Sequence, residues 1–344
     1  MAAGRPARGP QAEAQGAAMP EEGKGARRIA SLGECMVELS EARELGPAVL
    51  RRAFAGDTLN TAVHLARCLR RQREGAGWSV AYATRLGDDA LSAEMLAEWQ
   101  SEGIDTSLVR RDAGALPGLY MIRTDSAGER RFSYWRENAP ARRLFTAPDE
   151  VEVRASLAGF DMLYFSGVTV AILPVMGRER LIELARAVRR RGGRVAFDGN
   201  YRPLLWASKG EAAEWIAAAY ATADIALPSV EEKDLLGCPT AGALADRLQA
   251  EGAAEVVVKQ GSAPCLLRGR DGRAEVPSGP ALRVVDTTGA GDSFNAAYLA
   301  ARLTGAPPVS AARFGHRLAA QQIAAPGAIL PESALTIGPW QELE

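Results

Sequence analysis

A turn that contains two glycines and ends at an aspartate stands out in residues 286–303, which read DTTGAGDSFNAAYLAARL. Gly289, Ala290 and Gly291 form the turn, and Asp292 falls on the first turn of the helix that the next residues predict. A helix start leaves about four backbone N–H groups free, and glycines let an anion approach them without a Cβ clash. An aspartate beside a phosphoryl group can accept a proton from an attacking hydroxyl. We therefore interpret the turn as an anion hole and Asp292 as a general base; an ordinary helix start whose acid complements the helix dipole is the simpler alternative.

The composition excludes several other kinds of chemistry. The chain has 344 residues, 47% of them hydrophobic, and a net charge of −1, which indicates no nucleic-acid and no membrane-surface partner. No apolar run approaches the roughly 18–20 residues of a membrane span. With only two histidines, His64 and His316, the chain is a poor candidate for a histidine-based metal site. The four cysteines lie far apart without a CxxC pair, so we expect a reduced, cytoplasmic protein.

The first residues differ from the rest of the chain. Residues 1–27 are rich in Ala, Gly, Pro and Glu, and we expect a disordered tail because they can bury too little apolar surface to fold. They contain no apolar segment typical of a secretory signal, and Met19 is an alternative start. Because ordered patterning begins near Arg28, we expect one folded domain over residues 28–340.

The elements that must position Asp292 alternate between strands and helices. A strand at 29–32, a helix at 56–71, a strand at 79–87 and a helix at 91–103 open the pattern. The alternation then continues through further predicted elements: strands at 161–167, 194–200, 224–229, 255–261 and 263–269, and helices at 177–192, 209–223, 240–252 and 310–328. This order predicts an α/β fold with a mostly parallel central sheet covered by helices on both faces.

Two segments, at about 36–55 and 106–137, interrupt the alternation. The second contains two alternating strands, GLYMIRTD and RRFSYWREN, around SAGE, which is typical of a hairpin turn. We expect the two segments to form a small β-sheet outside the main one, acting as a lid over a site. A hairpin at the sheet edge without a role in binding is the alternative.

Several of these motifs, in this order, resemble the ribokinase-like (PfkB) carbohydrate kinases. DTTGAGDSFNAAYL is similar to the C-terminal signature of that family, and AGDTLNTA (55–62) and LGDDALSAEM (86–95) are similar to its N-terminal pattern. Within the family, the chain most resembles the kinases of 2-dehydro-3-deoxygluconate, through GECMVELS, GDTLNTA, YWREN, FDGNYRPLLWAS, VVVKQG and DTTGAGDSF. The resemblance implies a three-layer sandwich with a small β-sheet lid, and ATP with Mg²⁺ as phosphoryl donor.

The resemblance also implies roles for individual residues. Asp292 matches the catalytic base, and Gly289, Ala290 and Gly291 match the anion hole. Sugar-binding positions are matched by Gly56, Asp57, Asn60, Tyr120, Tyr134, Arg136 and Arg202, and nucleotide-side positions by Asn200, Lys259 and Gly261. An N-x-x-E motif that organises Mg²⁺ in relatives is replaced here by a segment with Ser229 and Glu232, so Glu232 is a possible metal residue acting through water. The loop around Asp286, Thr288 and 325–327 resembles a K⁺ loop.

Two arginines bear on the substrate. Arg136 and Arg202 carry forked donors suited to a carboxylate or phosphate, although Arg136 lies in a charged run and Arg202 precedes a proline, so each has an ordinary structural alternative. We expect ATP-dependent phosphorylation of 2-dehydro-3-deoxy-D-gluconate at its C6 hydroxyl. Alternatives are a kinase of fructose, ribose or an isomeric sugar acid, and a non-catalytic sugar sensor. The resemblance further implies a homodimer or higher oligomer.

Overall fold

The computed structural model describes Met1 and residues 27–42, 46, 48–124, 130–270, 272–279 and 283–343. The predicted disordered tail, apart from its two end residues Met1 and Arg27, lies outside these residues, and so does the SAGE turn. Within the described part of the chain, no helix has both the length and the apolar character that crossing a membrane requires.

The centre of the molecule is a sheet of eight strands in the order β14-β13-β12-β11-β10-β9-β1-β4. The six strands from β4 to β12 are parallel, and β13 and β14 continue the sheet antiparallel. The strands are β1 (Arg27–Leu32), β4 (Trp78–Ala83), β9 (Met162–Ser166), β10 (Arg194–Asp198), β11 (Ile225–Ala226), β12 (Glu255–Val258), β13 (Cys265–Gly269) and β14 (Gly272–Val276). The predicted mostly parallel sheet is therefore confirmed.

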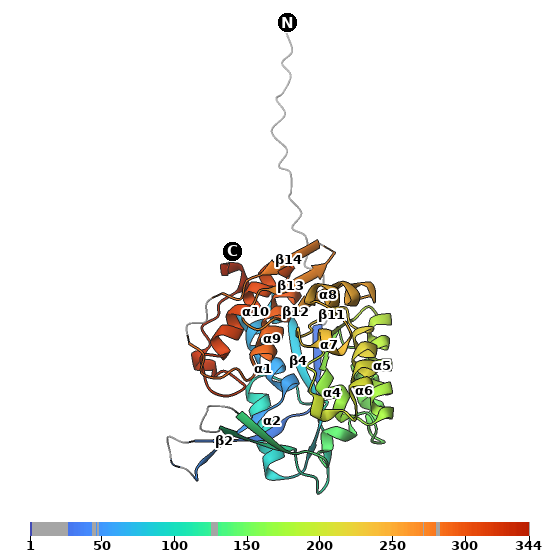
Figure 1. The fold of residues 1–344 in the computed structure, drawn as a ribbon, viewed down its shortest axis with the longest axis vertical. Helices are drawn as coiled ribbons and strands as arrows, with labels where there is room; N and C mark the ends of the chain where they lie inside the picture. The colour runs from blue at the N-terminus through green and yellow to red at the C-terminus, as the bar shows by residue number, and fades with distance from the viewer. Residues whose placement is uncertain are drawn as a thin grey trace.

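Helices cover both faces of this sheet because successive strand residues point to opposite sides. Along β1, Ile29 packs into one hydrophobic cluster and Ala30 into the other. The first face carries α1 (Asp57–Arg71), α2 (Ala90–Ser101), α9 (Ala290–Leu303) and α10 (Pro308–Gln322). The second carries α3 (Glu150–Leu157), α4 (Gly167–Ile172), α5 (Val175–Arg190), α6 (Lys209–Tyr220), α7 (Glu232–Leu235) and α8 (Ala241–Ala250). The result is the predicted three-layer sandwich (Figure 1).

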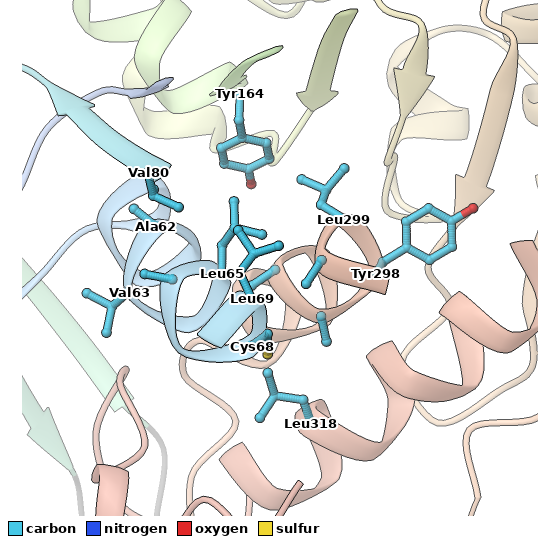
Figure 2. Packing of buried hydrophobic residues seen from close by; sticks show 14 of the residues in the cluster. Ala62, Val63, Leu65, Cys68, Leu69, Val80, Tyr164, Tyr298, Leu299 and Leu318 are labelled. Carbon is cyan, nitrogen blue, oxygen red and sulfur yellow. The ribbon is translucent and has the colours of Figure 1, made fainter. Parts of the chain in front are cut away.

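The first-face core holds α1 and α9 side by side. Leu65 and Leu69 of α1 pack with Leu299 of α9, and Leu318 of α10 closes the cluster on the side away from Tyr164 (Figure 2). Small residues along α9, among them Ala296 and Ala300, are fully buried and let the helices approach closely. This packing fixes the start of α9, and hence Asp292, against the start of α1.

A second sheet lies outside the sandwich, in the order β3-β2-β7-β8. Its strands are β2 (Met36–Glu41), β3 (Leu50–Ala55), β7 (Leu119–Thr124) and β8 (Arg130–Trp135). In Figure 1 this sheet, marked by β2, lies at the lower end of the molecule, opposite β14. The predicted small sheet is thus confirmed, and we refer to these four strands as the outer sheet.

Some element boundaries differ from the sequence-based expectation. The strand expected at 79–87 is two strands, because β5 (Arg85–Gly87) leaves the main sheet and pairs with β6 (Arg110–Asp112). The last long helix ends at Gln322, earlier than expected, because Gln322 and Asp286 draw the following loop back onto the start of α9. Short 3₁₀ helices complete the chain: η2 (Gly75–Gly77), η3 (Pro140–Arg143), η4 (Pro203–Leu205), η5 (Glu332–Ala334) and η6 (Trp340–Leu343).

Candidate active site

The candidate site lies where the parallel strands end and α1 and α9 begin. Asp198 is the last residue of β10, and Lys259 follows directly after β12. The carboxyl ends of parallel strands form one edge of a sheet, which is where α/β folds place their ligands. Asp292, on the first turn of α9, faces this edge and reaches the start of α1 through a hydrogen bond.

Asn60 connects Asp292 to the start of α1. Its Nδ2 donates to Asp292 Oδ2 at 2.8 Å, and its Oδ1 accepts from the backbone N–H of Gly56 at 3.3 Å. Gly56 is the residue before α1, and a Cβ there would lie 2.0 Å from the carbonyl oxygen of Glu34. Only glycine therefore fits between the outer-sheet connection and α1. The structure brings together the predicted base and two of the predicted sugar-binding residues.

The environment of Asp292 favours its protonated form. Its pKa is raised to about 7, first because burial disfavours the charged form and then because Asp57 and Asp198 add negative charge. The hydrogen bond from Asn60 and the charge of Lys259 act in the opposite direction. A carboxylate whose pKa lies near neutrality is suited to accept a proton and release it again.

The residues before Asp292 form an open helix start. Gly289 has φ 74°, in the left-handed region, and a Cβ there would lie 2.2 Å from the carbonyl oxygen of Ala328. Within the described part of the chain, no side chain caps the first N–H groups of α9, and Gly291 is exposed. Backbone N–H groups at this helix start are therefore available to an anion, as the sequence predicts.

Behind this helix start, a buried cluster of polar residues joins three strands and α9. Lys259 Nζ donates to Asp198 Oδ2 at 2.8 Å and to Asn295 Oδ1 at 3.2 Å. Asn295 Nδ2 donates to Asp198 at 2.6 Å and to the hydroxyl of Tyr164 at 3.1 Å. A Cβ on Gly291 would lie 3.7 Å from Lys259 Nζ, so the ammonium group lies against the open turn. Lys259 is thus placed to offer positive charge to an anion held by α9.

Sequence reasoning missed Asp198, Asn295 and Tyr164. Asp198 carried a usable signal, because it is an acid that ends a hydrophobic parallel strand. Asn295 follows Asp292 by three residues on the same helix face, which is a second signal. The position of Tyr164 depends on the sheet order.

Asn200 was predicted to lie on the nucleotide side of the site, but its side chain contacts a residue predicted to bind the sugar. Its Nδ2 donates to Asp57 Oδ2 at 2.7 Å, and its backbone φ of 34° is unusual for a residue other than glycine. Asp57 also accepts from the backbone N–H of Thr58 at 2.8 Å. The Asn200–Asp57 bond therefore joins the loop after β10 to the first turn of α1.

Glu232 points into the protein. It is 1% exposed, and its two carboxylate oxygens accept from the Tyr220 hydroxyl at 2.6 Å and the backbone N–H of Ser229 at 3.0 Å. Burial, and then the negative charge of Asp198, raises its pKa to about 7. A Cβ on Gly199 would lie 1.7 Å from Glu232 Oε2, so Glu232 packs directly against the backbone of Gly199, the residue after Asp198. Across the described residues, no group of three or more His, Cys, Asp or Glu side chains is arranged to hold a metal ion.

The loop that resembles a K⁺ site is organised by protein groups. Asp286 accepts from the backbone N–H of Thr288 at 2.8 Å and of Gly327 at 3.0 Å. Gln322 Nε2 donates to the carbonyls of Thr288 and Gly327 at 3.2 and 2.7 Å. The two carbonyls therefore converge on one point, which the side-chain amide of Gln322 occupies.

The outer sheet contributes the predicted aromatic and arginine residues. Tyr120 on β7 is buried, its hydroxyl donates to Glu38, and its ring lies 5.9 Å from that of Tyr134 on β8. Arg136, just after β8, is buried and forms an ion pair with Glu34, which follows β1. Burial raises the pKa of Glu34, and the adjacent Arg136 partly reverses the rise. The structure therefore places Arg136 at the site with a carboxylate of the protein already bound to it.

Two predicted residues lie apart from these contacts. Arg202, at the start of η4, is exposed, and its side chain makes no hydrogen bond or ion pair with any residue the structure describes. Gly261 lies in the loop after β12 with φ 59° and open space around it. The structure leaves both free to meet a ligand from solvent.

The fold and this arrangement of residues agree with the known proteins the chain matches. Residues 26–335 match the model of the pfkB family carbohydrate kinases. The chain belongs to this family. It is 44% identical, over 313 residues, to a 2-dehydro-3-deoxygluconokinase of Escherichia coli (strain K12), covering 90% of this chain and 99% of that relative.

Solved structures of the family share the fold. A PfkB protein from Polaromonas sp. JS666 is 28% identical with a TM-score of 0.74, covering 92% of this chain and 99% of that one. A proposed ribokinase II from E. coli in complex with ATP and Mg²⁺ has a TM-score of 0.73 at 20% identity, covering 88% and 94% of the two chains. As a member of this family, the chain is a sugar kinase, a phosphotransferase.

Proposed function

We propose that this kinase transfers the γ-phosphoryl group of ATP to the C6 hydroxyl of 2-dehydro-3-deoxy-D-gluconate. The product is 2-dehydro-3-deoxy-6-phosphogluconate. The assignment of the substrate rests on the 44% identity with 2-dehydro-3-deoxygluconokinase over almost the whole length of both chains. The geometry around Asp292 supports the reaction type.

Asp292 acts as the general base in this proposal. Its carboxylate accepts the proton of the C6 hydroxyl as the oxygen attacks phosphorus, and its raised pKa makes that transfer favourable near neutral pH. Asn60 holds one carboxylate oxygen by its 2.8 Å hydrogen bond, so the other oxygen is directed to the substrate. Asp57, beside Asn60, receives the sugar together with Gly56.

The start of α9 stabilises charge on the transferring group. The backbone N–H groups of Gly289, Ala290 and Gly291 bind phosphoryl oxygens, that of Ala290 after it leaves the carbonyl of Thr287, to which it donates at 3.3 Å. Lys259 adds positive charge from behind the turn. When bound, Mg²⁺ would be held mainly by the phosphates of ATP and would supply positive charge to them. Glu232 could reach such an ion only through water, because both of its oxygens are bound within the protein.

The nucleotide lies along the loops after β10 and β12. Gly261 has the open space that a nucleotide contact requires, and Lys259 precedes it by two residues. Asn200 lies between this side and the sugar side, and its bond to Asp57 supports a role in aligning the two substrates. K⁺ binding by the loop of Asp286 requires the Gln322 amide to release the carbonyls of Thr288 and Gly327.

The carboxylate of the sugar acid is bound by residues of the outer sheet and of the loop after β10. Arg136 and the exposed Arg202 are the predicted cations, and Tyr120 and Tyr134 flank Arg136 with aromatic and hydroxyl groups. The ion pair with Glu34 already neutralises Arg136. This observation favours one alternative, a kinase of a neutral sugar such as fructose or ribose. A sensor without activity is disfavoured, because it needs no base.

Three further features belong to this proposal. Residues 28–340 form the kinase domain, with the segments 36–55 and 106–137 contributing the lid. The exposed Phe132 and Trp135 on β8, an edge strand of the outer sheet, support pairing of two lids in a homodimer. The four free, buried cysteines support a reducing, cytoplasmic location.

A substrate panel tests the proposal. We expect ADP formation with 2-dehydro-3-deoxygluconate to exceed, in kcat/KM, that with the isomeric sugar acid, fructose and ribose. Mass spectrometry of the product should show one added phosphate on C6. A higher kcat/KM for a neutral sugar would contradict the substrate while leaving the kinase reaction intact.

A further inference from the structure

The side-chain amide of Gln322 lies at the point where a K⁺ ion would have to bind. The loop around Asp286, Thr288 and residues 325–327 resembles a K⁺ loop, and proteins bind K⁺ with backbone carbonyl oxygens that replace its water shell. Gln322 Nε2 donates to two such oxygens, those of Thr288 at 3.2 Å and of Gly327 at 2.7 Å. Gln322 is fully buried. A cation at this point would therefore have to displace a side chain that is packed inside the protein.

The orientation of this amide follows from its backbone partners. Carbonyl oxygens only accept hydrogen bonds, so the two carbonyls must face the nitrogen of Gln322, whose two N–H groups they use. The backbone N–H of Leu330 only donates, and it lies 2.8 Å from Gln322 Oε1. His64 Nε2 lies 3.2 Å from the same oxygen. Burial lowers the pKa of His64 to about 3, so its neutral ring donates to Oε1 near pH 7. A flipped amide would place oxygen against oxygen and N–H against N–H.

The acid of the loop is also bound by backbone groups. Asp286 is buried, and its two oxygens accept from the N–H of Thr288 at 2.8 Å and from the N–H of Gly327 at 3.0 Å. Asp286 thus binds the N–H groups of the same two residues whose carbonyls Gln322 binds. The two side chains together join the segment before α9 to the loop after α10, which is the task that a cation bound by both segments would perform.

This arrangement reaches the predicted anion hole through one peptide bond. The carbonyl of Thr288 and the N–H of Gly289 belong to the same planar trans peptide, so they point in opposite directions. Because Gln322 holds the carbonyl on the buried side, the N–H of Gly289 is turned away from that side. Gly289 is also packed against the loop after α10, since a Cβ there would lie 2.2 Å from the carbonyl oxygen of Ala328. Gln322 therefore orients the first N–H group of the anion hole.

We propose that Gln322 takes the place of a monovalent cation in this kinase, and that its amide keeps the anion hole assembled without K⁺. Each amide N–H offers a partial positive charge to a carbonyl to which an ion would offer a full one. The amide is attached to α10, so it does not have to be bound from solvent. This inference rests on the proposed phosphoryl transfer at the start of α9, and not on which sugar accepts the group.

The test measures turnover and thermal melting in tetramethylammonium buffer, whose cation is too large to fit between the two carbonyls, with and without added K⁺. Turnover and melting temperature of the wild-type enzyme should not respond to K⁺. Gln322→Ala removes two hydrogen bonds to the loop and should lower kcat by about 5- to 100-fold without K⁺. Added K⁺ should restore most of this loss. It should also raise the melting temperature of this variant, because an ion that binds only the folded protein stabilises it.

Two further variants serve as controls. Gln322→Met fills nearly the same volume without a donor, so it should lose activity, and K⁺ should restore neither turnover nor melting temperature. Gln321→Ala is the matched control, because Gln321 is the neighbouring glutamine on α10 and its Oε1 accepts from the backbone N–H of Thr336 at 3.0 Å. It should respond to K⁺ no more than the wild-type enzyme does.

Activation of the wild-type enzyme by K⁺ of more than about 3-fold would overturn the proposal, and this measurement does not depend on the folding of any variant. Full activity of Gln322→Met without K⁺, or the same response to K⁺ in Gln322→Ala and Gln322→Met, would also overturn it. If the enzyme phosphorylates no sugar, the proposed function fails. The melting curves then still decide whether K⁺ binds only when the amide is removed.

Discussion

Replacing the predicted base by its amide should change activity and stability in opposite directions. Asp292→Asn keeps the size of the side chain and an oxygen that can accept the 2.8 Å hydrogen bond from Asn60. Sugar and nucleotide binding should therefore change little. The amide cannot accept the proton of the C6 hydroxyl, so kcat should fall by at least ~100-fold, the lower end for loss of a general base.

The stability effect follows from the pKa of Asp292. A rise from about 3.9 in the unfolded chain to about 7 in the folded protein corresponds to about 4 kcal/mol against the charged form. Because the side chain is half-buried, solvent screens part of this, and we expect about 1–2 kcal/mol. The folded pKa is raised, so this penalty is absent below about pH 4, grows as the pH rises towards 7, and is complete above it. The amide carries no charge and avoids the penalty.

The assay combines turnover with thermal melting at two pH values. At pH 8 the melting temperature of Asp292→Asn should exceed that of wild-type enzyme by a few degrees, and at pH 4.5 the difference should largely vanish. Glu152→Gln, which neutralises an exposed acid on the first turn of α3, is the control and should change neither turnover nor melting. Near-normal turnover by Asp292→Asn would remove Asp292 from the mechanism. A lower melting temperature at pH 8 would refute the electrostatic reasoning.

Three other predictions test the surroundings of the base. Gly289→Ala places a Cβ 2.2 Å from a carbonyl oxygen and should lower both the melting temperature and kcat, whereas Gly305→Ala, with similar φ but open space, should cause only the smaller loss due to backbone strain. Lys259→Met leaves Asp198 buried without its cation and should lower the free energy of unfolding by about 3 kcal/mol or more in denaturant titrations. Asp57→Asn removes a charge that raises the pKa of the base, so the acid limb of the pH profile of kcat/KM should move to lower pH; an unchanged limb would contradict this coupling.

Local sequence patterns predicted those parts of the site whose residues are neighbours in the sequence. The start of α9 could be recognised because Gly289 and Asp292 lie three residues apart on one helix turn, and the geometry there depends on backbone alone. The pairing of α1 with α9 was not visible in the periodicity. It follows from small residues such as Ala296 that allow close packing across more than 200 residues of chain.

The partners of the predicted side chains depended on long-range contacts. Arg136 was predicted to be a site residue, but its ion pair with Glu34 joins positions that are 102 residues apart. Asn200 was assigned to the nucleotide side, and its bond to Asp57 became visible only with the sheet order. Sequence spacing carries no information on such pairs, because a charged residue in a loop has many possible partners.

Two strands of the outer sheet, β2 and β3, join the sandwich through very short connections. Only residues 33–35 separate β1 from β2, and Gly56 alone separates β3 from α1. A tilt of these two strands must therefore be absorbed by backbone that also surrounds the proposed sugar site, beside Asn60 and the Glu34–Arg136 pair. Sugar binding and the orientation of the outer sheet are then thermodynamically coupled. Because such coupling is reciprocal, a change in sheet orientation alters sugar affinity, and sugar binding alters sheet orientation. A substitution at Gly56 that fixed the tilt would register as altered discrimination among sugars even if it left every sugar-contacting side chain in place.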